Sequence, residues 1–323
     1  MPDYVDKVLL IGTGPMARDY AKVLKALDVP FDTLGRGTAS ATAYEQATGH
    51  HAFTGGVDGF LATASPASYK KAIVATGTES LGEVTRKLVA WGCKDLLVEK
   101  PGGKDIEEVI ALHQSLAASD SNVYIAYNRR FYASVQQLRE MAAEDGGVTS
   151  FNFEFTEWAH VIEPLQKAEG VKENWLFANS THVIDLAFYL GGEPADMSSY
   201  IAGDLSWHPV AIFAGAGVTT GGALFTYQAN WKAPGRWGVE ILTARRRFYL
   251  RPLEKLQVQN IGSVAIEELP IDDEADKQFK PGLFRQTQAF LQNDRARLVS
   301  LAEHIVNCAH YTQILKAGKV QGA

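Results

Sequence analysis

Residues 7–17 read Lys-Val-Leu-Leu-Ile-Gly-Thr-Gly-Pro-Met-Ala, a short apolar run followed at once by a turn with two glycines. The run Val8–Ile11 has the length of a buried strand, and the apolar spacing over residues 16–27 is typical of an amphipathic helix. A strand, a tight glycine turn and a helix in this order form the phosphate-binding part of a dinucleotide site. The alternative is a structural glycine turn in another kind of α/β protein.

Each small residue of the turn has a separate role in such a site. Gly12 permits the sharp turn after the strand, and Gly14 lacks a Cβ atom, so the backbone can approach a pyrophosphate. Ala17 lets the helix pack closely on the strand, and the N-terminus of that helix offers N–H groups to the phosphates. The residues of the turn predicted to contact the cofactor are Gly12, Thr13, Gly14, Pro15 and Met16.

The composition is that of a chain able to form a large apolar core. It has 323 residues, 46% of them hydrophobic and 21% charged, which suggests roughly two domains and argues against disorder. The net charge of −6 argues against a nucleic-acid partner, which would need a basic face. Cys93 and Cys308 lie far apart in no metal or redox spacing, so we expect no metal site and a reduced, cytoplasmic setting. The chain shows no apolar run as long as a membrane span and no signal-peptide pattern.

The order of predicted elements indicates two domains of different construction. Up to residue 127, strands alternate with helices, as in a doubly wound parallel sheet of the Rossmann type. After residue 148 the pattern becomes rich in strands and predicts a C-terminal α+β domain with one large open, mainly antiparallel sheet. We therefore assign residues 1–127 to a dinucleotide-binding domain and residues 128–323 to a substrate-binding and oligomerisation domain.

The predicted elements have the following bounds. The strands of the first domain are 8–11, 31–34, 51–53, 71–76, 95–98 and 123–126, with poorly patterned residues at 60–64. The strands of the second domain are 149–158, 197–205, 210–215, 218–231, 237–243, 246–251, 255–260 and 263–269, and its helices are 134–144, 179–190, 282–292 and 299–317.

The residues after the second strand distinguish the two nicotinamide cofactors. Rossmann domains that bind NAD carry an acidic residue there, whereas an arginine suits the 2′-phosphate of NADP. In this chain residues 35–38 read Gly-Arg-Gly-Thr, in which Arg36 offers a planar fork and Thr38 a hydroxyl. Asp32 is the competing acidic residue, but it falls inside the strand. We therefore prefer NADP, with NAD as the alternative, and the structural reading of Arg36 is a solvated turn residue.

A lysine follows the fifth predicted strand, in the sequence Glu99-Lys100-Pro101. The carboxyl end of that strand opens at the same crevice as the glycine turn, where open α/β sheets bind ligands. A lysine there can donate a hydrogen bond to a carbinol oxygen and stabilise the negative charge that develops as hydride leaves. The structural alternative is a surface lysine before a turn. Further predicted cofactor contacts at this edge are Thr76, Gly77, Thr78, Glu99, Lys100 and Asn128.

A second candidate group lies on the helix predicted over residues 179–190. Positions 178, 182 and 185 share one face of it, so His182 and Asp185 project together. If Asn179 or Ser180 caps the helix, His182 lies in the first turn, where the helix dipole favours a neutral imidazole able to exchange a proton. The structural alternative is a histidine that is hydrogen-bonded to Asp185.

The chain resembles the glucose–fructose oxidoreductase, inositol dehydrogenase and rhizopine-catabolism (Gfo/Idh/MocA) family over nearly its whole length. The features that carry the resemblance are the glycine turn, Glu99-Lys100-Pro101, the Asn-Arg-Arg-Phe segment 128–131, and the His-x-x-Asp helix followed by Leu-Gly-Gly at 190–192. The resemblance implies a Rossmann domain plus an open-faced α/β domain. It also implies hydride transfer to or from a carbon of a sugar or polyol, with Lys100 and His182 as catalytic residues.

The resemblance also implies association between copies of the chain. Members of the family commonly associate through the open face of the second sheet, so we expect a homodimer or homotetramer. Residues 218–231 offer apolar side chains for this contact, namely Leu224, Phe225, Tyr227 and Trp231.

The sequence departs from that family at two positions. The family often has an aspartate four residues before the helix histidine, and in this chain that residue is Ala178. It also often has a histidine after the fourth strand, and the corresponding residue is Leu81. Three interpretations stay open: Lys100 and His182 suffice for proton transfer, reduction is the physiological direction, or a polar residue replaces the carboxylate. The candidates for that replacement are Tyr127, Glu157 and Asn179.

We therefore expect an NAD(P)H-dependent oxidoreductase that transfers a hydride between nicotinamide and a secondary alcohol or ketone carbon of a sugar derivative, nucleotide-linked or acidic. Arg129 or Arg130 would bind an acidic group of the substrate unless they form structural ion pairs. The arginines at 245–247 would recognise a phosphate, and the structural alternative for them is a solvated turn between strands. Alternatives are a non-catalytic dinucleotide sensor and an enzyme that uses a tightly bound cofactor for redox-assisted elimination. Predicted substrate-binding residues are Lys100, Tyr127, Arg129, Trp158, Trp175, Asn179 and His182, with His160, Trp207 and Trp237 as further stacking candidates.

Overall fold

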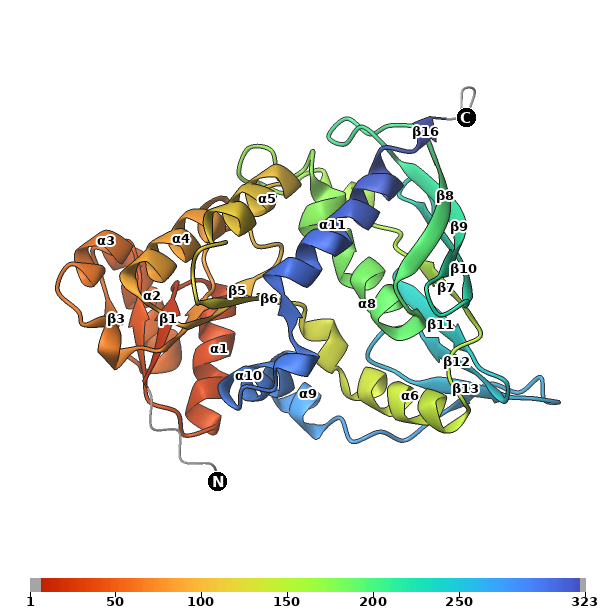
Figure 1. The fold of residues 1–323 in the computed structure, drawn as a ribbon, viewed down its shortest axis with the longest axis horizontal. Helices are drawn as coiled ribbons and strands as arrows, with labels where there is room; N and C mark the ends of the chain where they lie inside the picture. Colours follow the sequence, from red (N-terminus) through yellow and green to blue (C-terminus); the bar gives the residue numbers. More distant parts are fainter. Residues whose placement is uncertain (1–6, 320–323) are drawn as a thin grey trace. The chain divides into compact units, whose positions relative to one another are not determined.

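The computed structural model describes residues 7–319, which divide into two compact units (Figure 1). The first unit contains residues 7–128 and 277–306, and the second contains residues 129–276 and 307–319. The division after residue 128 lies close to the predicted boundary, but residues 277–306 return to the first unit instead of remaining in the second. They do so because β15 (Val299–Ser300) pairs with β6 (Asn122–Ala126), and α10 (Leu283–Leu291) packs on α1 (Pro15–Ala26).

The first unit is built on a doubly wound sheet, which confirms the prediction. Among the described residues the sheet has seven strands in the order β15-β6-β5-β4-β1-β2-β3, and each neighbouring pair is parallel except β15 with β6. All four residues of the interior strand β1 are buried, in agreement with their unbroken apolar sequence. The strands not yet delimited are β1 (Val8–Ile11), β2 (Phe31–Leu34), β3 (Ala52–Phe53), β4 (Lys71–Val74) and β5 (Asp95–Glu99).

Helices connect these parallel strands. They are α1, α2 (Thr38–Thr48), α3 (Gly56–Leu61), α4 (Leu81–Trp91) and α5 (Ile106–Ser115), while α11 (Leu301–Leu315) begins in the first unit and ends in the second. Helix α3 overlaps the poorly patterned residues of the sequence; none of its side chains is buried, so it has no apolar stripe to detect. Within residues 7–319, every helix is too short or too polar to span a membrane.

The second unit contains a large sheet that is mainly antiparallel, as predicted. Its order within the described residues is β14-β13-β12-β11-β7-β10-β9-β8-β16, and the parallel neighbours are β7 with β10 and β8 with β16. The expected strands at 210–215 and 218–231 are wrong, because β9 runs through residues 212–219 and the chain turns before β10. The turn includes Gly222, whose φ of +85° favours glycine.

The second unit contains the strands of this sheet and, among its described residues, four helices. The last of these, α9, lies at the boundary between the two units. The strands are β7 (Ser150–Glu154), β8 (Pro194–Ala202), β9 (Ile212–Thr219), β10 (Leu224–Asn230), β11 (Gly238–Leu242), β12 (Arg246–Leu250), β13 (Gln257–Asn260), β14 (Glu267–Glu268) and β16 (Gly318–Lys319). The helices are α6 (Ala133–Glu144), α7 (Ala159–Ile162), α8 (Thr181–Gly191) and α9 (Glu274–Gln278).

One face of the second sheet is covered by helices, and the other face is open. Helix α8 contacts β7 and β11, α6 contacts β12, and Figure 1 shows both helices on the same side of the sheet. Along β10, Phe225 and Tyr227 are buried, whereas Leu224 is 64% exposed. Trp231 is also buried, so the expected apolar contact surface is wrong for three of its four residues. Side chains of a strand alternate between faces, and these three do not point to the open one.

Candidate functional site

The glycine turn after β1 forms an open cradle in the first unit. Gly12 has a φ of +121°, and a Cβ atom there would lie 2.2 Å from the carbonyl oxygen of Ala75, so only glycine fits. Gly14 precedes α1 with a φ of −77°, and a Cβ atom there would meet no atom within 4 Å. Pro15 occupies the start of the helix, and no side chain caps it. The helix N-terminus therefore presents backbone N–H groups to open space, which suits a pyrophosphate.

The turn after β4 lies directly against this cradle. The Ala75 amide donates a 2.8 Å hydrogen bond to the carbonyl oxygen of Ile11, and the Ala75 carbonyl is the atom that excludes a side chain at Gly12. Thr76 and Gly77 follow at once, and Thr78 begins a 3₁₀ turn over Thr78–Ser80. The structure thus brings the predicted cofactor-binding turns after β1 and β4 into contact.

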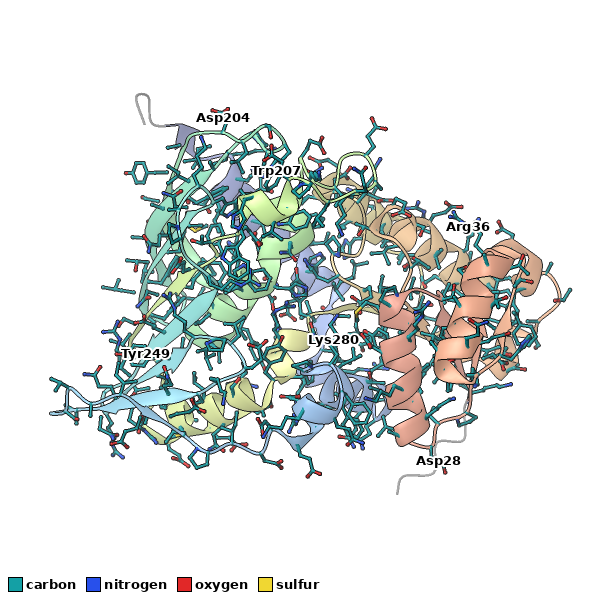
Figure 2. All side chains as sticks on the ribbon, turned by 180° about the vertical axis from the view of Figure 1, so that it is seen from behind. Asp28, Arg36, Asp204, Trp207, Tyr249 and Lys280 are labelled. Atoms are coloured by element: carbon teal, nitrogen blue, oxygen red, sulfur yellow. The ribbon has the colours of Figure 1, made fainter. Side chains whose placement is uncertain are left out.

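The tip of β2 carries an exposed arginine (Figure 2). Arg36 and Thr38 are both exposed, and Thr38 opens α2 without a side-chain cap. Asp32 lies inside β2, forms a 2.7 Å ion pair with Lys7 and accepts a hydrogen bond from Tyr69. Asp32 is therefore engaged within the unit, while Arg36 is the charged side chain at the tip of the strand.

The segment after β5 holds Lys100 in a buried position. Lys100 is only 8% exposed, so the alternative of a surface lysine does not hold. The preceding Glu99 accepts a 2.7 Å hydrogen bond from the Tyr20 hydroxyl of α1. Burial raises the pKa of Glu99, against the lowering effects of the Tyr20 hydrogen bond and of the positive charges of Lys280 and Lys100. A hydrogen bond from Tyr20 and two positive charges thus act on the carboxyl group at the end of β5.

A histidine that sequence reasoning missed supports the same segment. His304 on α11 is fully buried, and its Nε2 lies 3.0 Å from the carbonyl oxygen of Pro101. Because that carbonyl can only accept, Nε2 carries the hydrogen. The Nδ1 atom lies 3.5 Å from the hydroxyl of Tyr127, a predicted substrate contact. Asn128, a predicted cofactor contact, donates a 2.9 Å hydrogen bond to the carbonyl of Pro281.

In the second unit, His182 lies near the start of α8, and helical structure continues on the N-terminal side of this helix. A π-helical turn over Leu176–Ser180 continues into α8, and Ser180 has helical angles, with φ −66° and ψ −22°. The side chains of Asn179 and Ser180 donate hydrogen bonds of 2.9 and 2.8 Å to Oε1 of Glu157. Capping by Asn179 or Ser180 is therefore wrong, and the dipole argument for a neutral His182 does not apply.

The arginine that follows Arg129 has a structural partner. Arg130 donates two hydrogen bonds, of 2.8 and 2.6 Å, to the carboxylate of Asp185, and both side chains are buried. The Asn307 amide adds a 3.4 Å contact to the same carboxylate. Arg130 therefore forms a structural ion pair, which was the alternative to binding an acidic group of the substrate. Two arginines of the 245–247 group are similarly paired, Arg246 with Asp145 and Arg247 with Glu240.

A group of aromatic and charged side chains surrounds Trp237, just before β11. The guanidinium carbon of Arg129 lies 4.8 Å from the centre of the indole ring, and that of Arg236 lies 5.1 Å from it. The ring centre of His182 is 6.2 Å away. Arg236 also lies 4.8 Å over the ring of Trp158. We call these residues, with Glu157 and Asn179, the Trp237 cluster; it lies wholly within the second unit.

The Trp237 cluster unites four of the predicted substrate-binding residues. Arg129, Trp158, Asn179 and His182 belong to it, whereas Trp175 packs edge-on against Trp207, at 6.2 Å between ring centres. Trp207, labelled in Figure 2, in turn stacks on the indole of the buried core residue Trp231. Arg236 was not predicted, although its place directly before a candidate tryptophan was a signal in the sequence.

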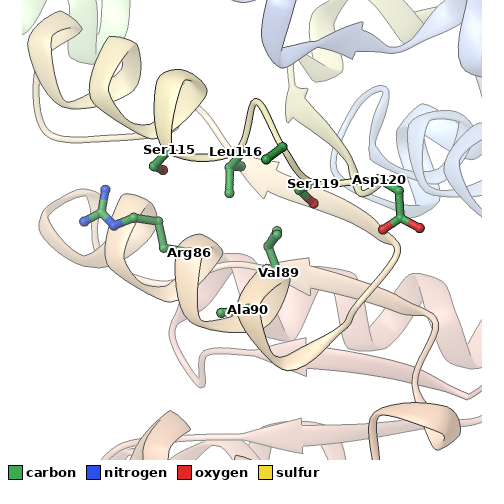
Figure 3. A pocket seen from close by; sticks show the side chains of 8 residues that line it. Arg86, Val89, Ala90, Ser115, Leu116, Ser119 and Asp120 are labelled. Carbon is green, nitrogen blue, oxygen red and sulfur yellow. The ribbon is translucent and has the colours of Figure 1, made fainter.

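A surface groove of about 540 Å³ lies elsewhere in the first unit, between α4 and α5 (Figure 3). Arg86 and Val89 line it from α4, and Leu116 and Asp120 line it from the segment that follows α5. It contains none of the predicted site residues. The described residues also hold no cluster of three or more histidine, cysteine or acidic side chains placed to bind a metal ion.

No protein-family model matches the sequence, and no curated protein was found to match it. Solved structures match over nearly the whole chain. UDP-N-acetylglucosamine 3-dehydrogenase from Acidithiobacillus ferrooxidans is 18% identical, with a TM-score of 0.74, and the match covers 96% of this chain and 97% of that one. Levoglucosan dehydrogenase in complex with NADH and levoglucosan is 17% identical, with a TM-score of 0.76 and coverage of 97% and 96%.

A third match is an oxidoreductase from Agrobacterium radiobacter in complex with NAD+, L-tartaric acid and magnesium. It is 13% identical, with a TM-score of 0.76, and the match covers 96% of this chain and 94% of that one. At these identities the likeness establishes a shared fold, which agrees with the fold that the sequence resemblance implied.

Proposed function

We propose that the protein is an NAD(P)H-dependent oxidoreductase that transfers a hydride between nicotinamide and a secondary alcohol or ketone carbon of a sugar or sugar derivative. The observation that carries the proposal is the buried Lys100 at the carboxyl end of β5, in the sheet whose glycine turn leaves open space beside Gly14. The dehydrogenases that share the fold support it, two of them named for sugar substrates.

The residues of the first unit fit a dinucleotide. The N-terminus of α1 and the backbone at Gly14 would hold the pyrophosphate, Arg36 and Thr38 would hold the adenosine ribose and its 2′-phosphate, and Thr76–Thr78 would border it. When bound, the cofactor supplies a nicotinamide that accepts or donates hydride. Lys100 donates a hydrogen bond to the oxygen on the reacting carbon and stabilises the charge that develops on it.

His182 carries the proton to or from that oxygen in the proposed mechanism. The carboxylate of Glu157 is the strongest candidate to replace the aspartate missing at Ala178, because Asn179 and Ser180 hold it in a fixed orientation from the helix that carries His182.

The proposal is tested by following the absorbance of NADPH and NADH with keto-sugars, and of NADP+ and NAD+ with the corresponding alcohols. Net oxidation or reduction with at least one sugar supports an oxidoreductase. Binding of the dinucleotide without any turnover across the panel would favour the sensor. Turnover without net absorbance change, with cofactor that copurifies, would favour redox-assisted elimination.

We expect Arg36→Asp to reverse the cofactor preference. The substitution removes a charge-assisted hydrogen bond to the 2′-phosphate and adds a repulsive charge, so the Kd of NADPH should rise by roughly 10- to 100-fold. The Kd of NADH should stay level or fall. Fluorescence titration measures both constants, and Arg86→Asp on α4 is the matched control for the change in charge. Equal NADPH affinity in the two variants contradicts the NADP preference.

We also propose that copies of the chain associate as a homodimer or homotetramer through the open face of the second sheet, in the cytoplasm. Tyr200 of β8 and Leu224 of β10 support this surface, because they are 58% and 64% exposed. Both cysteines of the chain are free and buried, in keeping with a reducing compartment.

A further inference from the structure

A lysine from a distant part of the sequence lies beside the glycine turn in the first unit. The Nζ atom of Lys280, labelled in Figure 2, is 2.8 Å from the sulfur of Met16, the second residue of α1. The positive charge of Lys280 also acts on the carboxyl group of Glu99, the last residue of β5. Lys280 therefore joins two residues of the predicted cofactor site, although sequence reasoning missed it.

The backbone on both sides of Lys280 is held within the first unit. The preceding residue, Phe279, is buried, and the ammonium of Lys22 on α1 lies 5.2 Å from the centre of its ring. The carbonyl of the following residue, Pro281, accepts a 2.9 Å hydrogen bond from the side-chain amide of Asn128. Lys280 itself is exposed. Its ammonium is thus presented near the N-terminus of α1 by neighbours that are themselves fixed.

Lys280 and the N-terminus of α1 are both electropositive. The backbone N–H groups of the first turn of α1 carry the positive end of the helix dipole, which repels a neighbouring cation and attracts an anion. The Glu99 carboxyl group offsets part of that repulsion from the end of β5. A phosphate at the helix N-terminus is attracted by the ammonium and by the N–H groups together, so each strengthens the binding that the other supports.

The pyrophosphate of a dinucleotide is the anion that fits this position. Each of its phosphates carries a negative charge, yet the turns over residues 12–16 and 76–78 contain no charged side chain. Arg36 is already proposed for the 2′-phosphate. We propose that Lys280 binds the pyrophosphate of the cofactor and supplies the positive charge that the two turns lack. The inference rests on the proposed function, because it adds a residue to the same dinucleotide site.

The test is calorimetric binding of NADPH, ADP-ribose and adenosine 2′-monophosphate to the full-length protein. ADP-ribose has the pyrophosphate without the 2′-phosphate, and adenosine 2′-monophosphate has the reverse. In Lys280→Met we expect the Kd of NADPH and of ADP-ribose to rise about tenfold, as the loss of one charge-assisted contact implies, with the Kd of adenosine 2′-monophosphate unchanged. Raised salt should weaken binding of the two pyrophosphate probes less in this variant than in the wild type. Lys280→Arg keeps the charge and should keep most of the affinity.

Lys25→Met is the matched control, because Lys25 is an exposed lysine in the last turn of the same helix, α1. Wild-type affinity for ADP-ribose in Lys280→Met, or an equal loss in Lys25→Met, overturns the inference and leaves the oxidoreductase untouched. Weaker binding of all three probes with a lower melting temperature would indicate a structural role for Lys280 and would also overturn it. A wild-type protein that binds neither NADPH nor ADP-ribose would contradict the proposed function itself.

Discussion

Lys100→Met is expected to lower kcat by roughly 100- to 10,000-fold, with the Kd of NADPH nearly unchanged. The side chain is 8% exposed at the end of β5, so its ammonium is largely withdrawn from water and its hydrogen bond to a developing alkoxide is strong. Methionine keeps much of the volume and removes the donor. Steady-state kinetics with the best sugar of the panel measures kcat, and fluorescence titration measures NADPH binding.

The matched control is Lys104→Met, four positions along the chain. The Lys104 side chain is 60% exposed, and its amine is 3.9 Å from Asp105, so its loss should change neither kcat nor stability noticeably. Full activity in Lys100→Met would remove Lys100 from the chemistry. An equal loss in both variants would indicate damage to the loop rather than loss of a catalytic group.

The sheet of the first unit was predictable because its parallel strands alternate with helices along the chain. A strand buried on both faces is an unbroken apolar run, as β1 is, and each such run is followed by a helix pattern. The return of residues 277–306 was not predictable, since β15 has two residues and its place is set by pairing with β6. To predict which side chains of β10 face the core, the register of the strand in the sheet must be known. The number of apolar residues in the strand does not give that register.

The candidate site was predictable where its residues follow a strand or share a helix face. The positions of Lys100 and Arg36 just after the ends of β5 and β2 were predicted in this way, and their roles stay predictions. His304 was missed because it acts on Pro101 across 203 positions of sequence, and nothing local marks it. The cap at Asn179 or Ser180 failed for a related reason: both side chains bond Glu157, a partner that lies outside the helix pattern. Sequence rules for helix caps consider only hydrogen bonds between residues that are close together in the chain.

Gly12 and Gly14 should respond in opposite ways to the same added methyl group. In Gly12→Ala the Cβ atom would lie 2.2 Å from the Ala75 carbonyl oxygen at a φ of +121°, so we expect the free energy of unfolding to fall by more than ~3 kcal/mol. In Gly14→Ala the φ of −77° suits alanine and nothing lies within 4 Å, so stability should fall by no more than about 1 kcal/mol.

The affinity for the dinucleotide gives a further test of Gly14→Ala. The space beside Gly14 is where a pyrophosphate would approach the backbone, so the Cβ atom of Gly14→Ala should raise the Kd of NADPH by about tenfold or more in a folded protein. Urea unfolding and fluorescence titration give the two quantities. Wild-type NADPH affinity in Gly14→Ala would mean that the pyrophosphate does not lie against this turn. Wild-type stability in Gly12→Ala would mean that the turns after β1 and β4 can separate without cost, and the cradle would then lose the rigidity that makes it a phosphate site.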